Sequence, residues 1–258
     1  MRVASNPMTR RLPACLLTVV LAAFGAAVYA EGAPVTANPS HGKEIFEKGK
    51  GGSVPPCSSC HGEKGLGNDT MGTPRLANVG YAYVVKQLTN FAEGQRQDLT
   101  QGVMPIFAQQ LTPEDRRDVA AFVNTLPWTS EESDLAALKA SGTEVGEAYK
   151  GEILVKYGVI GKAPACQSCH QYNGRGADPV FPMIGQQKYV YLTNQLKHWR
   201  DGSRANDPLG AMRAVAKNMT DEDIANAAAF LSHAPQSVMG DSFVPDNQSI
   251  LKNVVLVK

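Results

Sequence analysis

The sequence predicts an all-α protein built from two similar, small helical domains. A long internal repeat is the first reason, since Gly42–Gly49 aligns without a gap with Gly151–Gly158 at an offset of 109, and after one deletion the match continues at an offset of 108. Each copy contains segments with helical periodicity and helix-start signals, and no segment shows a convincing strand pattern. A period this long indicates two homologous domains rather than a solenoid.

Three helices are expected in each copy, in the same order. The first covers about 40–48 and about 144–157, and it ends at a glycine, as many helices do. The second covers about 81–91 and 189–199. The third begins at Thr112 and at Thr220, where a threonine N-cap precedes acidic residues in the first turn. Its apolar residues recur with helical spacing and predict one buried stripe per copy: Val119, Phe122, Val123 and Leu126, and Ile224, Ala227, Ala228 and Leu231.

A Cys-x-x-Cys-His motif stands at the same place in both copies, as Cys57–His61 and Cys166–His170. Two thiols three positions apart can each add to one vinyl group of a haem, and the adjacent histidine then becomes an axial ligand of the iron. We therefore expect two covalently bound haem c groups, attached at Cys57, Cys60, Cys166 and Cys169, with His61 and His170 on the iron. A zinc site or a thioredoxin-like motif is the competing interpretation, but a histidine follows each motif directly and no βαβ pattern surrounds either one.

The repeat also selects the second iron ligand. Methionine is a common partner of histidine on haem iron, and Met104 and Met212 occupy aligned positions shortly before the last helix of each copy. Both are therefore expected to be ligands. The remaining methionines after the first motif have no aligned methionine and are expected to fill space: Met71, Met183, Met219 and Met239. The histidines outside the motifs do not recur either and are expected at the surface or at helix ends.

Residues 1–30 have the pattern of a secretory signal peptide. Arg2, Arg10 and Arg11 form a basic start, Leu12–Ala27 is apolar, and small residues surround a cleavage site at Ala30. An uncleaved membrane anchor is the alternative, although the apolar run is short for a membrane span. Outside this segment every cysteine belongs to a haem motif, so no thiol remains for a structural disulfide.

The predicted organisation has five parts: the signal peptide (1–30), a first domain (31–127), a linker (128–143), a second domain (144–235) and a C-terminal tail (236–258). The tail has no counterpart after the first domain, and its apolar end is too short to span a bilayer. The formal net charge is +1, and cleavage of the signal would leave 22 Lys and Arg against 24 Asp and Glu. This near-neutral balance does not favour nucleic acid as a partner and predicts no steering patch.

Together these residues resemble the di-haem cytochrome c4 family over about residues 40–235. Further matching marks are a Pro-x-x-Gly-Gln sequence at Pro182–Gln186, paired Gln-Leu and Gly-x-Arg sequences in the second helices and the loops after them, and Ala-Ala-Phe in both last helices. One departure is Ala77-Asn78, where the second copy has Gly185-Gln186. The resemblance implies a tandem pair of class I cytochrome c domains, each a small helical fold around one covalently bound haem.

The resemblance also implies roles for other recurring residues. Pro74 and Pro182 would turn their carbonyls toward the haem histidines and orient them. The recurring tyrosines, Tyr81, Tyr83, Tyr189 and Tyr191, would pack on haem or at the domain contact, with hydrogen bonds to propionates or across the interface. Arg96 and Arg204 are expected either to pair with propionates or to lie on the solvated surface.

The implied function is that of a periplasmic carrier of single electrons between respiratory complexes, for example from a cytochrome bc complex toward a terminal oxidase, with a peripheral membrane association allowed. Iron held by histidine and methionine has no open coordination position, which suits electron transfer rather than catalysis. Two alternatives stay open. One is a haem subunit of a flavocytochrome c-type dehydrogenase. The other is a di-haem enzyme, such as a peroxidase or a thiosulfate dehydrogenase, which generally needs one vacant or exchangeable iron position.

Overall fold

The computed structural model describes residues 36–159 and 161–235. The predicted signal peptide and C-terminal tail, including Met239, lie outside these residues. The first repeat contains α1 (Pro39–Lys48), α2 (Ser58–His61), α3 (Tyr81–Ala92), α4 (Met104–Gln110) and α5 (Pro113–Thr125), and the second contains α7 (Ala148–Tyr157), α8 (Gln167–His170), α9 (Tyr189–Asp201), α10 (Ala211–Ala216) and α11 (Asp221–His233). In the described part of the chain, extended pairing is limited to isolated bridges, so the all-α prediction is confirmed.

Short elements join these helices. A single helix, α6 (Leu135–Ala140), lies in the connector between the repeats, and the 3-10 turns η1 (Tyr172–Gly174) and η2 (Pro208–Gly210) belong to the second repeat. The Asp134 side chain starts α6 by accepting a hydrogen bond from Ala137 N at 2.9 Å. The linker predicted at residues 128–143 therefore contains one short helix.

The last helices start as predicted. Thr112 accepts a hydrogen bond from the Asp115 N–H while the Asp115 carboxylate accepts one from the Thr112 N–H, and Thr220 and Asp223 form the same capping box. Each box satisfies two backbone donors that a helix start would otherwise leave without partners. The last helix of each repeat therefore begins at the same position.

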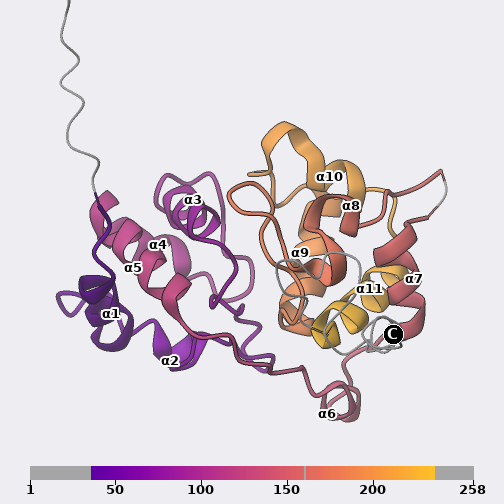
Figure 1. The fold of residues 1–258 in the computed structure, drawn as a ribbon, viewed down its shortest axis with the longest axis horizontal. Coiled ribbons are helices and arrows are strands. Elements are labelled where there is room, and N and C mark those ends of the chain that lie inside the picture. Colours follow the sequence, from indigo (N-terminus) through magenta and orange to yellow (C-terminus); the bar gives the residue numbers. More distant parts are fainter. Residues whose placement is uncertain (1–35, 160, 236–258) are drawn as a thin grey trace, which may run out of the picture. The chain divides into compact units, whose positions relative to one another are not determined.

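The first and last helices of each repeat cross at a glycine. A Cβ added to Gly42 would lie 1.9 Å from the Asp118 carbonyl oxygen, and one added to Gly151 would lie 1.8 Å from that of Asn226. Only glycine allows two helix backbones to approach this closely. In Figure 1 α1 lies against α5 and α7 against α11, and these contacts form the frame of each repeat.

In the second repeat the first helix begins at Ala148 rather than near residue 144. Residues just before it pack on α11, because a Cβ on Gly146 would lie 2.3 Å from the Ala225 carbonyl carbon. The Glu147 N–H also donates to Asn226 Oδ1 at 2.7 Å. Residues 146 and 147 therefore pack on α11 before the helix starts, although the sequence pattern predicted helix there.

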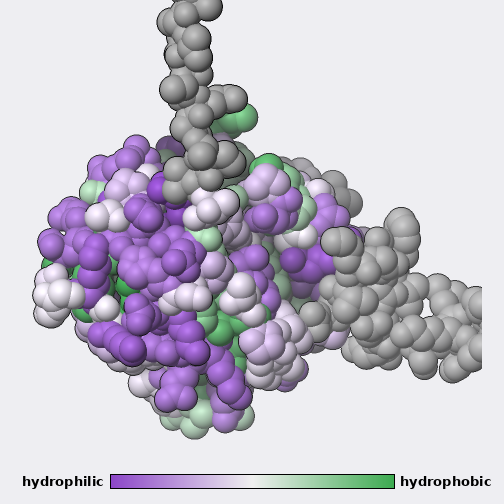
Figure 2. Space-filling view, turned by 60° about the vertical axis from the view of Figure 1, so that its left-hand side comes forward, coloured by the Kyte–Doolittle hydropathy of each residue, from purple (hydrophilic) through white to green (hydrophobic). Residues whose placement is uncertain are grey.

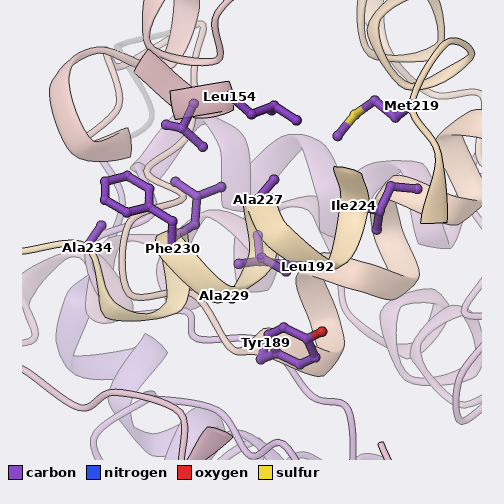
Figure 3. Packing of buried hydrophobic residues seen from close by; sticks show 12 residues of the cluster. Leu154, Tyr189, Leu192, Met219, Ile224, Ala227, Ala229, Phe230 and Ala234 are labelled. Carbon is purple, nitrogen blue, oxygen red and sulfur yellow. The ribbon is translucent and has the colours of Figure 1, made fainter. Parts of the chain in front are cut away.

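Both repeats build their cores on the last helix. The predicted stripe of α11 is almost fully buried and packs against Leu154, Tyr189 and Leu192 from α7 and α9 (Figure 3). Met219 also lies in this core, as its lack of an aligned methionine predicted. In the first repeat, the rings of Phe46 and Phe122 pack 5.3 Å apart where α1 meets α5.

Three of the exposed apolar residues, Tyr149, Ile153 and Tyr157, follow one another at four-residue spacing along α7. The face in Figure 2 is mostly hydrophilic, with small apolar patches between the charged residues. Among residues 36–159 and 161–235, no helix has both the length and the apolar character that a bilayer crossing needs.

Candidate haem sites

Each Cys-x-x-Cys-His motif folds into one short helix that buries its histidine. His61 closes α2 and His170 closes α8, and both are less than one-tenth exposed. The His61 Nδ1 atom lies 2.9 Å from the Pro74 carbonyl oxygen, and the His170 Nδ1 atom lies 2.8 Å from that of Pro182. A carbonyl only accepts hydrogen bonds, so Nδ1 carries the proton in both rings. The predicted role of the two prolines is thereby confirmed.

Burial lowers the pKa of both histidines, and the proline carbonyls only partly oppose this effect. Each imidazole is therefore neutral, with Nδ1 protonated and the lone pair of Nε2 available. A neutral imidazole fixed through its other nitrogen is the usual form of a histidine that ligates a metal.

The loops that carry the prolines are held by the same bonds in both repeats. The carbonyl of Gly65 accepts the Leu76 and Ala77 N–H groups at 2.7 and 3.0 Å, and the carbonyl of Gly174 accepts those of Ile184 and Gly185 at 2.7 and 2.9 Å. Gly65 and Gly174 both have positive φ, 63° and 72°, a conformation that glycine adopts at little cost. The turn after each motif therefore returns the chain to its own histidine.

The first cysteine of each motif is half-buried, and burial raises the pKa of the Cys57 and Cys166 thiols to about 11. Neither is in a disulfide, and the same holds for Cys60 and Cys169. The donor set of each motif, two thiols and one oriented imidazole, therefore fits a haem c group.

Met104 and Met212 are both half-buried, and each lies in a short helix that precedes the last helix of its repeat. Met104 opens α4, where the Asp98 carboxylate accepts the Val103 and Met104 N–H groups at 3.1 and 3.4 Å. Met212 is in the first turn of α10, where the Asp207 carboxylate accepts the Arg213 N–H at 3.0 Å. An acid six residues before Met104 and another five residues before Met212 thus hold the backbone beside each methionine. Sequence reasoning did not single out these two acids, because Asp98 aligns with Asn206 and not with Asp207.

Arg96 and Arg204 are not on the solvated surface, because they are only 7% and 5% exposed. They lie in a polar network between the repeats, which we call the arginine network: Tyr83, Gln87, Arg96, Tyr191, Gln195 and Arg204. Of the tyrosine hydrogen bonds predicted across the interface, those of Tyr83 and Tyr191 are confirmed there, whereas the Tyr189 hydroxyl donates to the Glu144 carbonyl at 2.7 Å. The alternative prediction, that both arginines lie on the solvated surface, was wrong. The second repeat covers Arg96, and the first repeat covers Arg204.

The arginine network has an internal symmetry. Arg96 donates to Gln87 of its own repeat at 2.7 Å and to Tyr191 and Gln195 of the other at 3.1 and 3.0 Å. Arg204 donates to Gln195 at 2.7 Å and to Tyr83 and Gln87 at 3.1 and 3.2 Å. Each arginine thus bonds the glutamine of its own repeat and the tyrosine and glutamine of the other repeat.

Neither guanidinium has a carboxylate within ion-pair distance among the described residues. Arg96 Nε, moreover, is buried without a hydrogen-bond partner. Buried cations normally require a counter-charge. Haem carries two propionates, and the arginine network would supply a positive charge and an unused donor to such groups.

Comparison with known proteins agrees with this geometry. The cytochrome c family model matches residues 40–127 and 162–235. The thiosulfate dehydrogenase electron acceptor of Thiomonas intermedia (strain K12) is 35% identical over 184 residues, which cover 70% of this chain and 79% of that protein.

Two solved structures are similar to the fold. Reduced recombinant cytochrome c4 from Pseudomonas stutzeri has a TM-score of 0.62 and 28% identity, covering 77% of this chain and all of that one. The thiosulfate dehydrogenase TsdBA from Marichromatium purpuratum has a TM-score of 0.68 and 31% identity, but this chain spans only 40% of it. The chain thus belongs to the cytochrome c family, as a di-haem electron carrier of the cytochrome c4 type with two covalently bound haem c groups.

Proposed function

We propose that His61 and Met104 are the axial ligands of the first haem and that His170 and Met212 are those of the second. Cys57 and Cys60, and Cys166 and Cys169, would form the thioether links. The observation that carries this proposal is the matched hydrogen bond from each motif histidine to a proline carbonyl, at 2.9 and 2.8 Å. It leaves one nitrogen of each buried ring for iron.

When bound, each haem supplies a one-electron iron couple, which histidine–methionine ligation shifts to higher potential. The chain's residues do the rest. The proline carbonyls hold each imidazole in one orientation and increase its basicity. The helix starts at Met104 and Met212 hold the thioethers, and burial of both histidines excludes water. With both sides of the iron filled by protein, each site would exchange electrons without binding a substrate.

In the cell, the proposed role is a periplasmic carrier that accepts electrons from a thiosulfate-oxidising dehydrogenase and passes them toward a terminal oxidase. The donor side is supported by two relatives named as thiosulfate dehydrogenase electron acceptors, 35% and 31% identical to this chain. The acceptor side follows from the likeness to cytochromes c4, and residues 1–30 support export. A cytochrome bc complex is the alternative donor.

Rapid mixing of the oxidised holoprotein with a thiosulfate dehydrogenase and thiosulfate tests this role. We expect haem reduction that requires both the enzyme and thiosulfate, followed by reoxidation on adding a terminal oxidase. The same experiment with a reduced cytochrome bc complex tests the alternative donor. Turnover of thiosulfate or peroxide by this chain alone would contradict the carrier role and favour an enzyme.

A further inference from the structure

A glutamine of the second repeat holds the backbone next to the first haem motif's proline. The Gln187 side-chain amide makes two hydrogen bonds with Arg75: its Oε1 accepts the Arg75 N–H at 2.6 Å, and its Nε2 donates to the Arg75 carbonyl at 3.0 Å. Both residues are almost fully buried, with 5% and 1% of their surface exposed. Hydrogen bonds shielded from water in this way are the ones that fix geometry.

Arg75 directly follows Pro74, whose carbonyl oxygen lies 2.9 Å from His61 Nδ1. The peptide bond from Pro74 to Arg75 is planar, so the Arg75 N–H bonded to Gln187 and the Pro74 carbonyl bonded to His61 belong to one rigid unit. A displacement of the Arg75 N–H therefore also displaces the Pro74 carbonyl. Gln187 is thus two hydrogen bonds away from the imidazole ring.

The Arg75 side chain anchors the same point from the connector. Its Nε donates to the Ala77 carbonyl at 3.1 Å, its Nη2 donates to the Thr129 carbonyl at 2.9 Å, and its guanidinium lies 4.3 Å from the Trp128 ring centre. These contacts hold the Arg75 side chain, whereas the two Gln187 bonds hold its main chain, to which the Pro74 carbonyl is joined.

The second repeat has no equivalent of the Gln187–Arg75 hydrogen bonds among the described residues. The position of Gln187 is occupied in the first repeat by Val79, and that of Arg75 is occupied in the second by Met183. The reciprocal contact is one backbone bond, from the Met183 N–H to the Val79 carbonyl at 3.3 Å. No side-chain amide among the described residues therefore grips the backbone beside Pro182 in the same way.

We propose that Gln187 is a positioning residue for the first haem, which fixes the Pro74 carbonyl against His61 and thereby sets the potential of that haem alone. The inference rests on the proposed ligation of the first iron by His61. A firm hydrogen bond to Nδ1 makes the imidazole a stronger electron donor to iron and stabilises the oxidised form. Loosening the Pro74 carbonyl weakens this bond, so the potential of the first haem rises.

The test replaces Gln187 in the full holoprotein. Gln187→Val installs the residue of the first repeat, and Gln187→Met keeps the side-chain volume while removing both hydrogen bonds. Asp69→Ala is the matched control, because it removes another bond between the repeats, from the Val190 N–H to Asp69 Oδ1 at 2.9 Å, without contacting residues 74–75. A redox titration gives the potentials, and the hyperfine-shifted NMR signals of the oxidised protein report the orientation of each histidine ring.

In both Gln187 variants we expect an upward shift of the first haem's potential and a changed hyperfine pattern at that haem, with the second haem unchanged. Signals that disappear in Met104→Ala or in Met212→Ala assign each haem. Equal shifts of both haems, no shift, or the same selective shift in Asp69→Ala would overturn the proposal. The wild-type spectrum tests His61 ligation separately, because a first haem without imidazole signals would contradict the proposed ligands themselves.

Discussion

His41 Nδ1 lies 2.8 Å from Asp118 Oδ2, near the point where α1 crosses α5. The other oxygen of the same carboxylate accepts the Asn38 N–H at the start of α1, at 2.7 Å. The second repeat has the neutral Asn226 in place of Asp118, and it accepts the Glu147 N–H at the same distance of 2.7 Å. The helix-start bond is thus shared by both repeats, whereas the histidine–carboxylate pair belongs to the first.

This pair predicts a pH-dependent stability. The hydrogen bond to Asp118 raises the pKa of His41, burial opposes it, and the charges of Asp118, Asp115 and Glu44 act in the same upward sense. A histidine with a raised folded-state pKa stabilises the fold fully below its unfolded pKa of about 6.5, and this contribution is lost as the pH rises through the folded pKa. Unfolding by denaturant at a series of pH values across this window should therefore show stability falling as pH increases.

Asp118→Asn should flatten this dependence while keeping the helix-start bond, because it copies Asn226. An unchanged slope in the variant would show that other groups are responsible for the pH dependence.

Gly42→Ala and Gly151→Ala should each destabilise the fold. The added Cβ would fall 1.9 and 1.8 Å from a carbonyl oxygen of the crossing helix, so the helices must separate. Overpacking of this kind costs about 1–3 kcal/mol and sometimes more. Denaturation of the holoprotein measures the loss. The exposed Ser40→Ala in α1 is the control and should be nearly neutral, and a neutral Gly42→Ala would contradict the described crossing.

Met104→Ala and Met212→Ala should each remove the methionine-to-iron charge-transfer band of one haem and lower the potential of that haem, since the thioether ligand favours reduced iron. Absorption and magnetic circular dichroism with a redox titration measure both effects. Met219→Leu, in the core of the second repeat, should leave both bands in place. An alanine variant that keeps the charge-transfer bands of both haems would show that the replaced methionine is not a ligand.

Arg96→Met and Arg204→Met should destabilise the contact between the repeats and lower the haem potentials. Each replacement leaves buried glutamine and tyrosine groups of the arginine network without a partner, at about 1–3 kcal/mol for such a loss. Removal of a buried positive charge also favours oxidised iron. Arg200→Met is the control, because its ion pair with the largely exposed Asp221 is worth at most about 1 kcal/mol. Equal effects in all three variants would argue against the arginine network.

Local chemistry explains the features that were predicted well. The capping boxes at Thr112 and Thr220 involve residues three apart, and the haem motif needs only five consecutive residues. The short helices α4 and α10 were missed because seven and six residues are too few for a clear helical period.

The sequence by itself determined the repeat, the motif spacing, the helix starts and the matched pairs of histidines and methionines, because these depend on neighbours along the chain or on identity at aligned positions. Only the tertiary structure decided that Arg96 and Arg204 are buried and that Gln187 grips Arg75. Most of the partners that decide this come from the other repeat, 95 to 121 residues away along the chain. Burial of a polar side chain depends on what covers it, and that is set by the contact between the repeats.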